Sequence, residues 1–223
     1  MKSRFLPLVA CLAAASPIWA TPSGLNNIPT ADVTPQGVVV LQSFTNFGND
    51  KDADLTLGFK TGLDLFGQKF EFGADSHIVP DKGGPIVLQA KYSLPFGEGL
   101  PTLGLGVANI TVTNDDRDRA GDPFSYAVLT HDFNGLFRAH VGYGVQADNN
   151  SVLLGVDKTV KLFERDLTLR SDFIQIQDES QWMGSLGFLY ALHDNVVLES
   201  WASQPFDDGD TIYTVKLNFV FKF

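Results

Sequence analysis

Cysteine is almost absent from this sequence: only Cys11 occurs among 223 residues, and it lies in an N-terminal stretch with the features of a secretory signal peptide. Lys2 and Arg4 give a basic start, a short apolar run follows, and a cleavage site is predicted after Ala20. Cleavage there would leave a mature chain without any cysteine. Disulfide bonds are therefore excluded as a source of its stability.

Basic residues are also scarce. Lys and Arg number 16 against 26 Asp and Glu, which gives a formal net charge of −10. Removal of Lys2 and Arg4 with the signal peptide leaves 14 basic residues (16 minus 2) against the same 26 acidic residues, a net charge of −12. Such an acidic exterior repels nucleic acid and anionic surfaces. We therefore expect no nucleic-acid partner.

Long apolar runs and helical patterns are missing as well. After residue 20 no stretch of eighteen apolar residues occurs, so no transmembrane helix is expected. No segment has the apolar period of an amphipathic helix, and no linker divides the chain. The sequence instead predicts twelve β-type segments separated by turn signals. These segments are Gly37–Phe47, Asp54–Thr61, Gln68–His77, Ile86–Leu94, Pro101–Thr113, Phe124–His131, Leu136–Ala147, Ser151–Val160, Asp166–Gln177, Gln181–Leu192, Val196–Ser203 and Thr211–Phe223.

The strongest alternation lies in the last segment. From Thr214 onward, apolar side chains occupy one face, while the other face carries Thr, Lys and Asn. A period of two residues indicates a strand whose two faces meet different environments. Six further segments alternate clearly. Three others separate less well into two faces, and these are Phe124–His131, Ser151–Val160 and Val196–Ser203.

Two architectures can use such strands. A soluble sandwich buries its apolar faces against each other, whereas a transmembrane barrel turns them to lipid and turns the polar faces to a lumen. The segments are close to the roughly nine to eleven residues that cross a bilayer at a tilt, and Tyr and Trp lie near segment ends. An even number of strands also lets the sheet close without an edge in lipid. The sequence therefore favours an all-β fold, a single antiparallel up-and-down transmembrane β-barrel of about twelve strands.

The connections between segments alternate in chemistry. Most odd-numbered connections are acidic, such as 114–118 and 207–210, whereas even-numbered connections carry apolar residues, such as 65–67 and 162–164. In an up-and-down meander, odd and even connections lie at opposite ends. The predicted barrel therefore has two chemically distinct ends, and we expect the acidic end to face outside.

The last strand carries a further signal. With the signal peptide and the β-meander, it resembles the outer-membrane β-barrel proteins of Gram-negative bacteria, porins among them. This resemblance implies a location in the bacterial outer membrane, in contact with its lipid and lipopolysaccharide. It also implies that the barrel-assembly machinery recognises the terminal aromatic strand. The residues that match this assembly signal are Tyr213, Leu217, Phe219, Phe221 and Phe223.

Three regions are expected along the chain: a signal peptide at 1–20, a periplasmic leader or small plug at 21–36, and the barrel at 37–223. In the second region, Gly24–Val33 followed by Gly37 is similar to the segment that opens some YjbH-type, exopolysaccharide-associated outer-membrane proteins. That similarity implies a role in envelope or exopolysaccharide assembly.

The polar faces indicate what lies inside the predicted barrel. Basic and acidic residues are nearly balanced on these faces, so the excess acid lies in the connections. Charges inside a barrel line a water-filled channel or form a paired internal network. Many inward positions are glycine, which we expect to free space for an open or narrow pore. The expected lumen-lining residues are Lys60, Lys69, Glu71, Asp75, Lys91, Arg138, His140, Arg170, Asp172, Glu199 and Lys216.

Three functions fit this pattern. We favour a passive channel for small hydrophilic solutes, and the alternative is a non-conducting barrel that interacts with envelope or exopolysaccharide assembly partners. A lipid-active outer-membrane enzyme has less support, because the serine motif of the outer-membrane phospholipases is missing. Ser76 and His77 are adjacent and so point to opposite faces of a strand. We therefore expect no catalytic residue, no cofactor and no metal site.

Overall fold

The computed structural model describes residues 21–48, 51–78, 84–112, 117, 120–147, 149–176, 181–207 and 209–223, and it places the side chains of all of these except 51–53 and 176. The expected signal peptide and parts of the acidic connections lie outside these residues. Within the described ranges no helix is both long and apolar enough to cross a membrane. The described residues form the strands β1 (Val38–Gly48), β2 (Lys51–Leu65), β3 (Gln68–Ile78), β4 (Ile86–Pro95), β5 (Thr102–Thr111), β6 (Phe124–Asp132), β7 (Arg138–Gln146), β8 (Asn149–Leu162), β9 (Arg165–Ile176), β10 (Gln181–His193), β11 (Val196–Pro205) and β12 (Ile212–Lys222).

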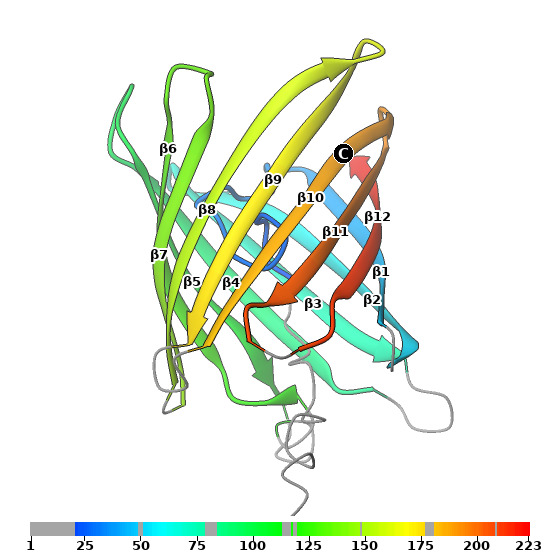
Figure 1. The fold of residues 1–223 in the computed structure, drawn as a ribbon. Helices are drawn as coiled ribbons and strands as arrows, with labels where there is room; N and C mark the ends of the chain where they lie inside the picture. The colour runs from blue at the N-terminus through cyan, green and yellow to red at the C-terminus, as the bar shows by residue number, and fades with distance from the viewer. Residues whose placement is uncertain are drawn as a thin grey trace, which may run out of the picture.

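The strands close into one antiparallel ring in which each pairs with its neighbours in sequence and β1 pairs with β12 (Figure 1). This last pairing aligns Val38 with Lys222. The predicted all-β fold, a closed up-and-down barrel of twelve strands, is confirmed. Predicted and observed strand ends agree within two residues except at β2, which begins at Lys51 rather than Asp54 and ends at Leu65 rather than at residue 61.

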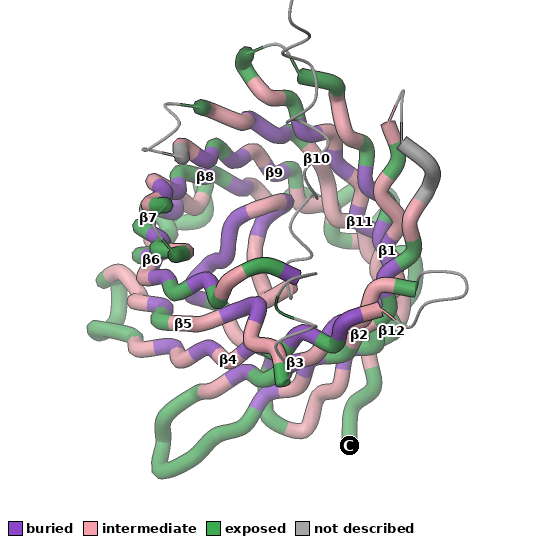
Figure 2. The backbone as a smooth tube through the Cα atoms, turned by 90° about the horizontal axis from the view of Figure 1, so that it is seen from below, coloured by how far each residue is buried: buried purple, intermediate pink, exposed green. Residues whose placement is uncertain are grey.

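The outer surface of the barrel is apolar. On β2, Leu57 and Phe59 are 45% and 44% exposed, whereas Thr56 and Lys60 on the opposite face are 2% and 9% exposed. Figure 2 shows the same alternation of buried and exposed positions around the ring. A water-soluble protein distributes apolar and polar side chains the other way round. An apolar exterior with a polar interior is the arrangement of a barrel in lipid.

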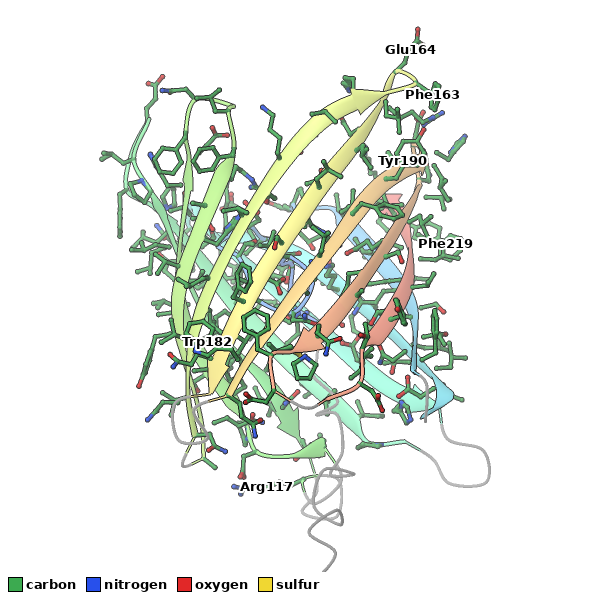
Figure 3. The ribbon with its side chains drawn as sticks, viewed as in Figure 1. Arg117, Phe163, Glu164, Trp182, Tyr190 and Phe219 are labelled. Carbon is green, nitrogen blue, oxygen red and sulfur yellow. The ribbon has the colours of Figure 1, made fainter. Side chains whose placement is uncertain are left out.

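Two aromatic residues mark the height of the apolar band on β10. Trp182 and Tyr190 lie near opposite ends of this strand (Figure 3). They are eight residues apart, which is about 27 Å along a strand that rises ~3.4 Å per residue. At a strand tilt of about 40° this corresponds to about 21 Å of height, close to the ~25 Å apolar band of outer-membrane barrels. Their positions fit aromatic girdles at the two membrane interfaces.

The even-numbered connections lie at one end of the barrel. Two-residue turns join β2 to β3 and β8 to β9, and their residues have positive φ: 57° and 77° at Phe66 and Gly67, 49° and 67° at Phe163 and Glu164. Type I′ hairpin turns require this conformation. Phe163 and Glu164 lie at the opposite end from Arg117, which belongs to the β5–β6 connection (Figure 3). The short even-numbered turns therefore lie at one end of the barrel, and the β5–β6 connection lies at the other.

Residues 21–36, called here the lumenal segment, lie inside the barrel (Figures 1 and 2). The segment turns back on itself: the Leu25 N–H donates to the Ile28 carbonyl at 2.9 Å, and Gly24 pairs with Pro29 in an antiparallel bridge. Leu25 and Ile28 are 6% and 2% exposed. The tip of the turn is therefore covered by the barrel wall.

The inward-facing glycines do not leave the lumen open. A Cβ on Gly62 would overlap the carbonyl oxygen of Thr34, and one on Gly155 would overlap the side chain of Leu25. At Gly106 the ring of Tyr126 occupies the corresponding space. The expectation that inward glycines such as Gly106 and Gly155 free space for a pore is therefore wrong, because the lumenal segment and neighbouring side chains fill that space.

Candidate functional site

Glu71 on β3 is fully buried and holds two distant parts of the lumenal segment. Its carboxylate accepts hydrogen bonds from the Ser23 N–H at 2.8 Å and the Ser23 hydroxyl at 2.5 Å. It also accepts from the N–H and the hydroxyl of Thr34, both at 2.8 Å. Hydrogen bonds to a charged acceptor are roughly twice as strong as neutral ones. One side chain thus closes the segment into a loop.

Two further buried carboxylates bind the same segment. Asp172 on β9 accepts hydrogen bonds from the N–H groups of Asn26 at 2.8 Å and Asn27 at 2.9 Å. Asp75 on β3 accepts from the backbone nitrogen and the hydroxyl of Thr21, both at 2.6 Å. With Glu71, these carboxylates satisfy five backbone N–H groups of the segment. Buried N–H groups need such partners.

The tip of the lumenal segment packs on an apolar patch of the inner wall. Leu25 and Ile28 contact inward-facing residues of β6, β8 and β9, with Met183 of β10 at the margin. Two of these strands, β6 and β8, correspond to predicted segments whose faces did not separate clearly. The reason is that they are apolar on both faces, one toward lipid and one toward the segment. The patch consists of Phe124, Tyr126, Val128, Leu153 and Ile174.

Three ion pairs stabilise the charged part of the wall. Lys91 Nζ lies 3.8 Å from Glu71, Arg138 lies 2.6 Å from Asp157, and Arg170 lies 2.7 Å from Glu199. Lys91 also donates to the carbonyl of Ser23 at 2.6 Å, and Arg138 also donates to Asp32 at 2.9 Å. Buried charges are stable when they are paired and hydrogen-bonded in this way. The network therefore connects the wall to the lumenal segment.

Two lumenal lysines differ from the rest. Among the described residues, Lys60 on β2 and Lys216 on β12 have no ion-pair partner within 4.0 Å, and they are 9% and 4% exposed. Lys216 Nζ lies 5.7 Å from the ring centroid of Phe44, a cation–π distance. In the described part of the chain, side-chain hydrogen bonds from the lumenal segment reach β11, β12, β1 and β2 only at Gln42 and Ser203. This wall therefore presents positive charge that the segment does not neutralise.

A cavity of about 330 Å³ lies at the end of the barrel that carries the even-numbered connections. Residues 31–36 of the lumenal segment form one side of it, and the ends of β2, β3, β4 and β5 form the other. Asp64 and Lys69, which are cross-strand partners, both line it. Lys69 is exposed, so this expected lumen residue lies at the mouth of the barrel rather than in its interior.

His140 belongs to a buried chain of hydrogen bonds. Its Nδ1 lies 2.9 Å from the Thr130 hydroxyl and its Nε2 lies 3.2 Å from Asp157. Hydroxyl, imidazole and carboxylate occur here in the order of a hydrolase triad. The Thr130 hydroxyl, however, accepts the N–H of Ala31 at 3.0 Å and is covered by the lumenal segment. The arrangement holds the segment and leaves no open approach to the hydroxyl.

Most expected lumen-lining residues lie in the interior. Arg138 is partly buried and Lys69 is exposed. Thr130 and Gln42 also contact the lumenal segment but were not among the expected residues, because Thr and Gln occur on both faces of such strands and carry no distinguishing signal. The buried members of the expected set are Lys60, Glu71, Asp75, Lys91, His140, Arg170, Asp172, Glu199 and Lys216.

Of the expected assembly signal, Tyr213, Leu217, Phe219 and Phe221 lie along the outer face of β12, and Phe223 follows the end of that strand. Figure 3 shows Phe219 on the outside of the barrel. Between β1 and β12, the two strands that close the barrel, the rings of Phe47 and Tyr213 stack with centroids 5.8 Å apart. Their recognition by the assembly machinery stays a prediction. The exposed fractions are 45% for Tyr213, 41% for Phe219, 43% for Phe221 and 91% for Phe223, and Leu217 is partly buried.

The comparisons with known proteins fall into two groups. No protein-family model matches the chain, and no curated protein matches it by sequence. Solved structures do match in fold. A KdgM porin has a TM-score of 0.61 and 8% identity over 82% of this chain and 99% of its own, and a NanC porin has a TM-score of 0.53 and 8% identity over 81% and 98%. A second KdgM porin structure, in complex with disordered oligogalacturonate, has a TM-score of 0.59. The chain therefore has the fold of the outer-membrane porins.

Proposed function

We propose that this chain is a passive channel for small hydrophilic solutes in the bacterial outer membrane, with the lumenal segment narrowing its bore. The closed barrel, the apolar exterior and the charged interior support this function. In that membrane the outer band would contact lipid and lipopolysaccharide, and the barrel-assembly machinery would recognise β12. In this role the chain would conduct solutes and would catalyse no reaction.

One observation carries the proposal: Lys60 and Lys216 have no ion-pair partner among the described residues, whereas the other buried lysine and the arginines of the wall are paired. A sealed barrel interior would leave two ammonium groups without a carboxylate in direct contact, and a buried ion without such a partner costs up to several kcal/mol. Water beside them removes that cost. The solute path therefore runs between the lumenal segment and the wall formed by β11, β12, β1 and the part of β2 around Lys60, since the segment contacts β2 at Gly62.

The same two lysines give the path a preference for anions. Glu199, the buried acidic residue of this wall among the described residues, is paired with Arg170 at 2.7 Å and accepts a further hydrogen bond from Asn218 at 2.5 Å. Lys60 and Lys216 therefore share the one negative charge of Glu199 with Arg170, which leaves this wall with an excess of positive charge. Rings and clusters of basic side chains select anions in pores of this kind. We infer that the preferred solutes are small and negatively charged.

Ion selectivity tests this proposal. The refolded chain, residues 21–223, would be placed in a planar bilayer between unequal KCl solutions, and the reversal potential would be measured. We expect chloride preference, and we expect the double variant Lys60→Gln, Lys216→Gln to lose it. Lys158→Gln is the matched control, because Lys158 lies on the outer face of β8 and bonds the Gly135 carbonyl. A reversal potential that is unchanged by the double variant would contradict the proposed path.

The position of the lumenal segment favours a second candidate, a non-conducting barrel that binds an envelope or exopolysaccharide assembly partner. The segment is held on several sides by buried side chains, as a permanent plug would be. This candidate requires a bilayer without conduction steps and a periplasmic protein that co-purifies with the barrel. Discrete steps would exclude it.

A further inference from the structure

Asp75 is a buried carboxylate without a cationic partner among the described residues. It is 2% exposed, and no Lys or Arg nitrogen of the described chain lies within 4.0 Å of it. Its oxygens accept hydrogen bonds from Thr21, through the backbone nitrogen and the hydroxyl, and from Gln42 Nε2 at 2.6 Å. A buried carboxylate is costly without an opposite charge. The ammonium of Lys216 acts on Asp75 only from beyond 4.0 Å, so the carboxylate still lacks a cation in direct contact.

The surroundings of Asp75 form a built site for the residue at position 21. Gln42 on β1 donates to the Thr21 hydroxyl at 2.8 Å, and Gln89 on β4 donates to the Thr21 carbonyl at 3.1 Å. A Cβ on Gly58 would overlap the carboxylate of Asp75, so only glycine leaves room for that side chain. Groups from several strands therefore converge on one backbone position.

We propose that Asp75 is the binding site for the amino terminus that forms when the chain is cleaved between Ala20 and Thr21. Hydrolysis adds water across that peptide bond, leaving a carboxylate on Ala20 and an amine on Thr21, which takes up a proton at neutral pH. An amide N–H with one proton thereby becomes an ammonium with three protons and a full charge. It lies 2.6 Å from a buried carboxylate oxygen.

The ammonium–carboxylate pair locks the lumenal segment in place. A charge-assisted hydrogen bond replaces a neutral donor, and Asp75 gains a cation in direct contact. Removal of the signal peptide therefore strengthens the docking of a segment that Thr21 already places beside Asp75. This inference rests on the expected cleavage after Ala20 and is independent of conduction through the barrel.

The cleavage site is tested first. The full chain would be secreted by a Gram-negative host, purified from the outer membrane and measured by intact mass spectrometry. We expect a protein that begins at Thr21. A mature chain that begins at Pro22 or later, or upstream of Thr21, would overturn the proposal, because no ammonium group would then stand beside Asp75.

The pairing is tested by the reactivity of the terminal amine. The folded protein would be treated with an acetylating N-hydroxysuccinimide ester at neutral pH, and the N-terminal peptide would be quantified by mass spectrometry. We expect acetylation about tenfold faster in Asp75→Asn than in the parent, because the amine loses its charged partner. Asp172→Asn is the control: it loosens the segment at Asn26 and Asn27 without touching the amine, and it should change the rate far less. Equal rates in all three proteins would refute the pairing.

A second measurement covers the case in which Asp75→Asn does not fold. The parent chain would be acetylated at its α-amine in denaturant and then refolded beside unmodified protein. Thermolysin, which cleaves before Leu, would then report release of the segment at Leu25. We expect cleavage about tenfold faster after acetylation. An unchanged cleavage rate would count against the lock.

Discussion

Thr34 passes over Gly62 so closely that a Cβ on Gly62 would overlap the Thr34 carbonyl oxygen. The contact joins the end of the lumenal segment to the inner face of β2, and Gln36 forms a parallel bridge with the same glycine. Because the obstacle is a backbone atom, it cannot turn aside as a side chain would. The position of the segment therefore depends on the absence of a side chain at residue 62.

A methyl group at residue 62 should displace the segment. In Gly62→Ala the barrel should still close, because its strand pairing does not involve the segment, but the hydrogen bonds of Thr34 to Glu71 should weaken. We expect faster thermolysin cleavage at Leu25 in folded protein. Gly184→Ala is the matched control, since its Cβ would meet only the rings of Phe206 and Phe173, which can turn. Equal cleavage of the two variants would contradict the steric argument.

Glu71 should be the most sensitive charge in the lumen. Glu71→Ala removes four hydrogen bonds to the segment and leaves Lys91 buried without its partner. Breaking a buried pair in this way costs about 3–5 kcal/mol. Asp166→Ala is the comparison, because its pair with Lys161 is exposed and such pairs contribute about 0–1 kcal/mol. Urea unfolding in lipid vesicles, followed by tryptophan fluorescence, measures both, and similar shifts would argue against the role of Glu71.

The apolar tip of the segment should contribute to stability. Leu25→Ala opens a cavity beside Gly155 and the patch on β6 and β8, which should lower the free energy of unfolding by about 2–5 kcal/mol. Leu136→Ala, in an exposed connection, should change it by less than about 0.5 kcal/mol. The same urea experiment compares them. If Leu25→Ala behaves like Leu136→Ala, the tip is not packed against the wall in the membrane.

Phe223 should matter for assembly more than for stability. It is 91% exposed and lies beyond the end of β12. Phe223→Ser should refold in detergent like the parent, yet it should reach the outer membrane of a Gram-negative host in lower amount. Phe163→Ser, at a similarly exposed turn, should refold like the parent and reach the outer membrane in the same amount as the parent. Heat-dependent gel mobility of refolded and of membrane-extracted protein separates the two effects, and normal membrane levels of Phe223→Ser would remove the residue from the assembly signal.

The barrel could be predicted from the sequence because it depends on local alternation. A period of two residues at Leu55, Leu57 and Phe59 determines which face of β2 meets lipid, and every strand is short enough to be marked by its own turns. Closure followed from the even strand count and the apolar face of β12. None of these steps needs a contact between residues far apart in sequence.

The contents of the lumen could not be predicted in the same way. The alternation indicates that Asp172 faces inward, but not that its partner is the backbone of Asn26, which is 146 residues away. Inward glycines such as Gly155 indicate space without showing what fills it. The apolar inner faces of β6 and β8 gave a weak signal, the failure of their faces to separate, which could have indicated a packed segment.

Single-channel recording tests the central claim most directly. The refolded chain, residues 21–223, would be inserted into a planar bilayer after folding is verified by heat-dependent gel mobility. A narrow charged path beside the lumenal segment predicts discrete, voltage-stable conductance steps that carry more chloride than potassium. A folded protein that inserts and stays silent would contradict the channel and leave the barrel a binding protein.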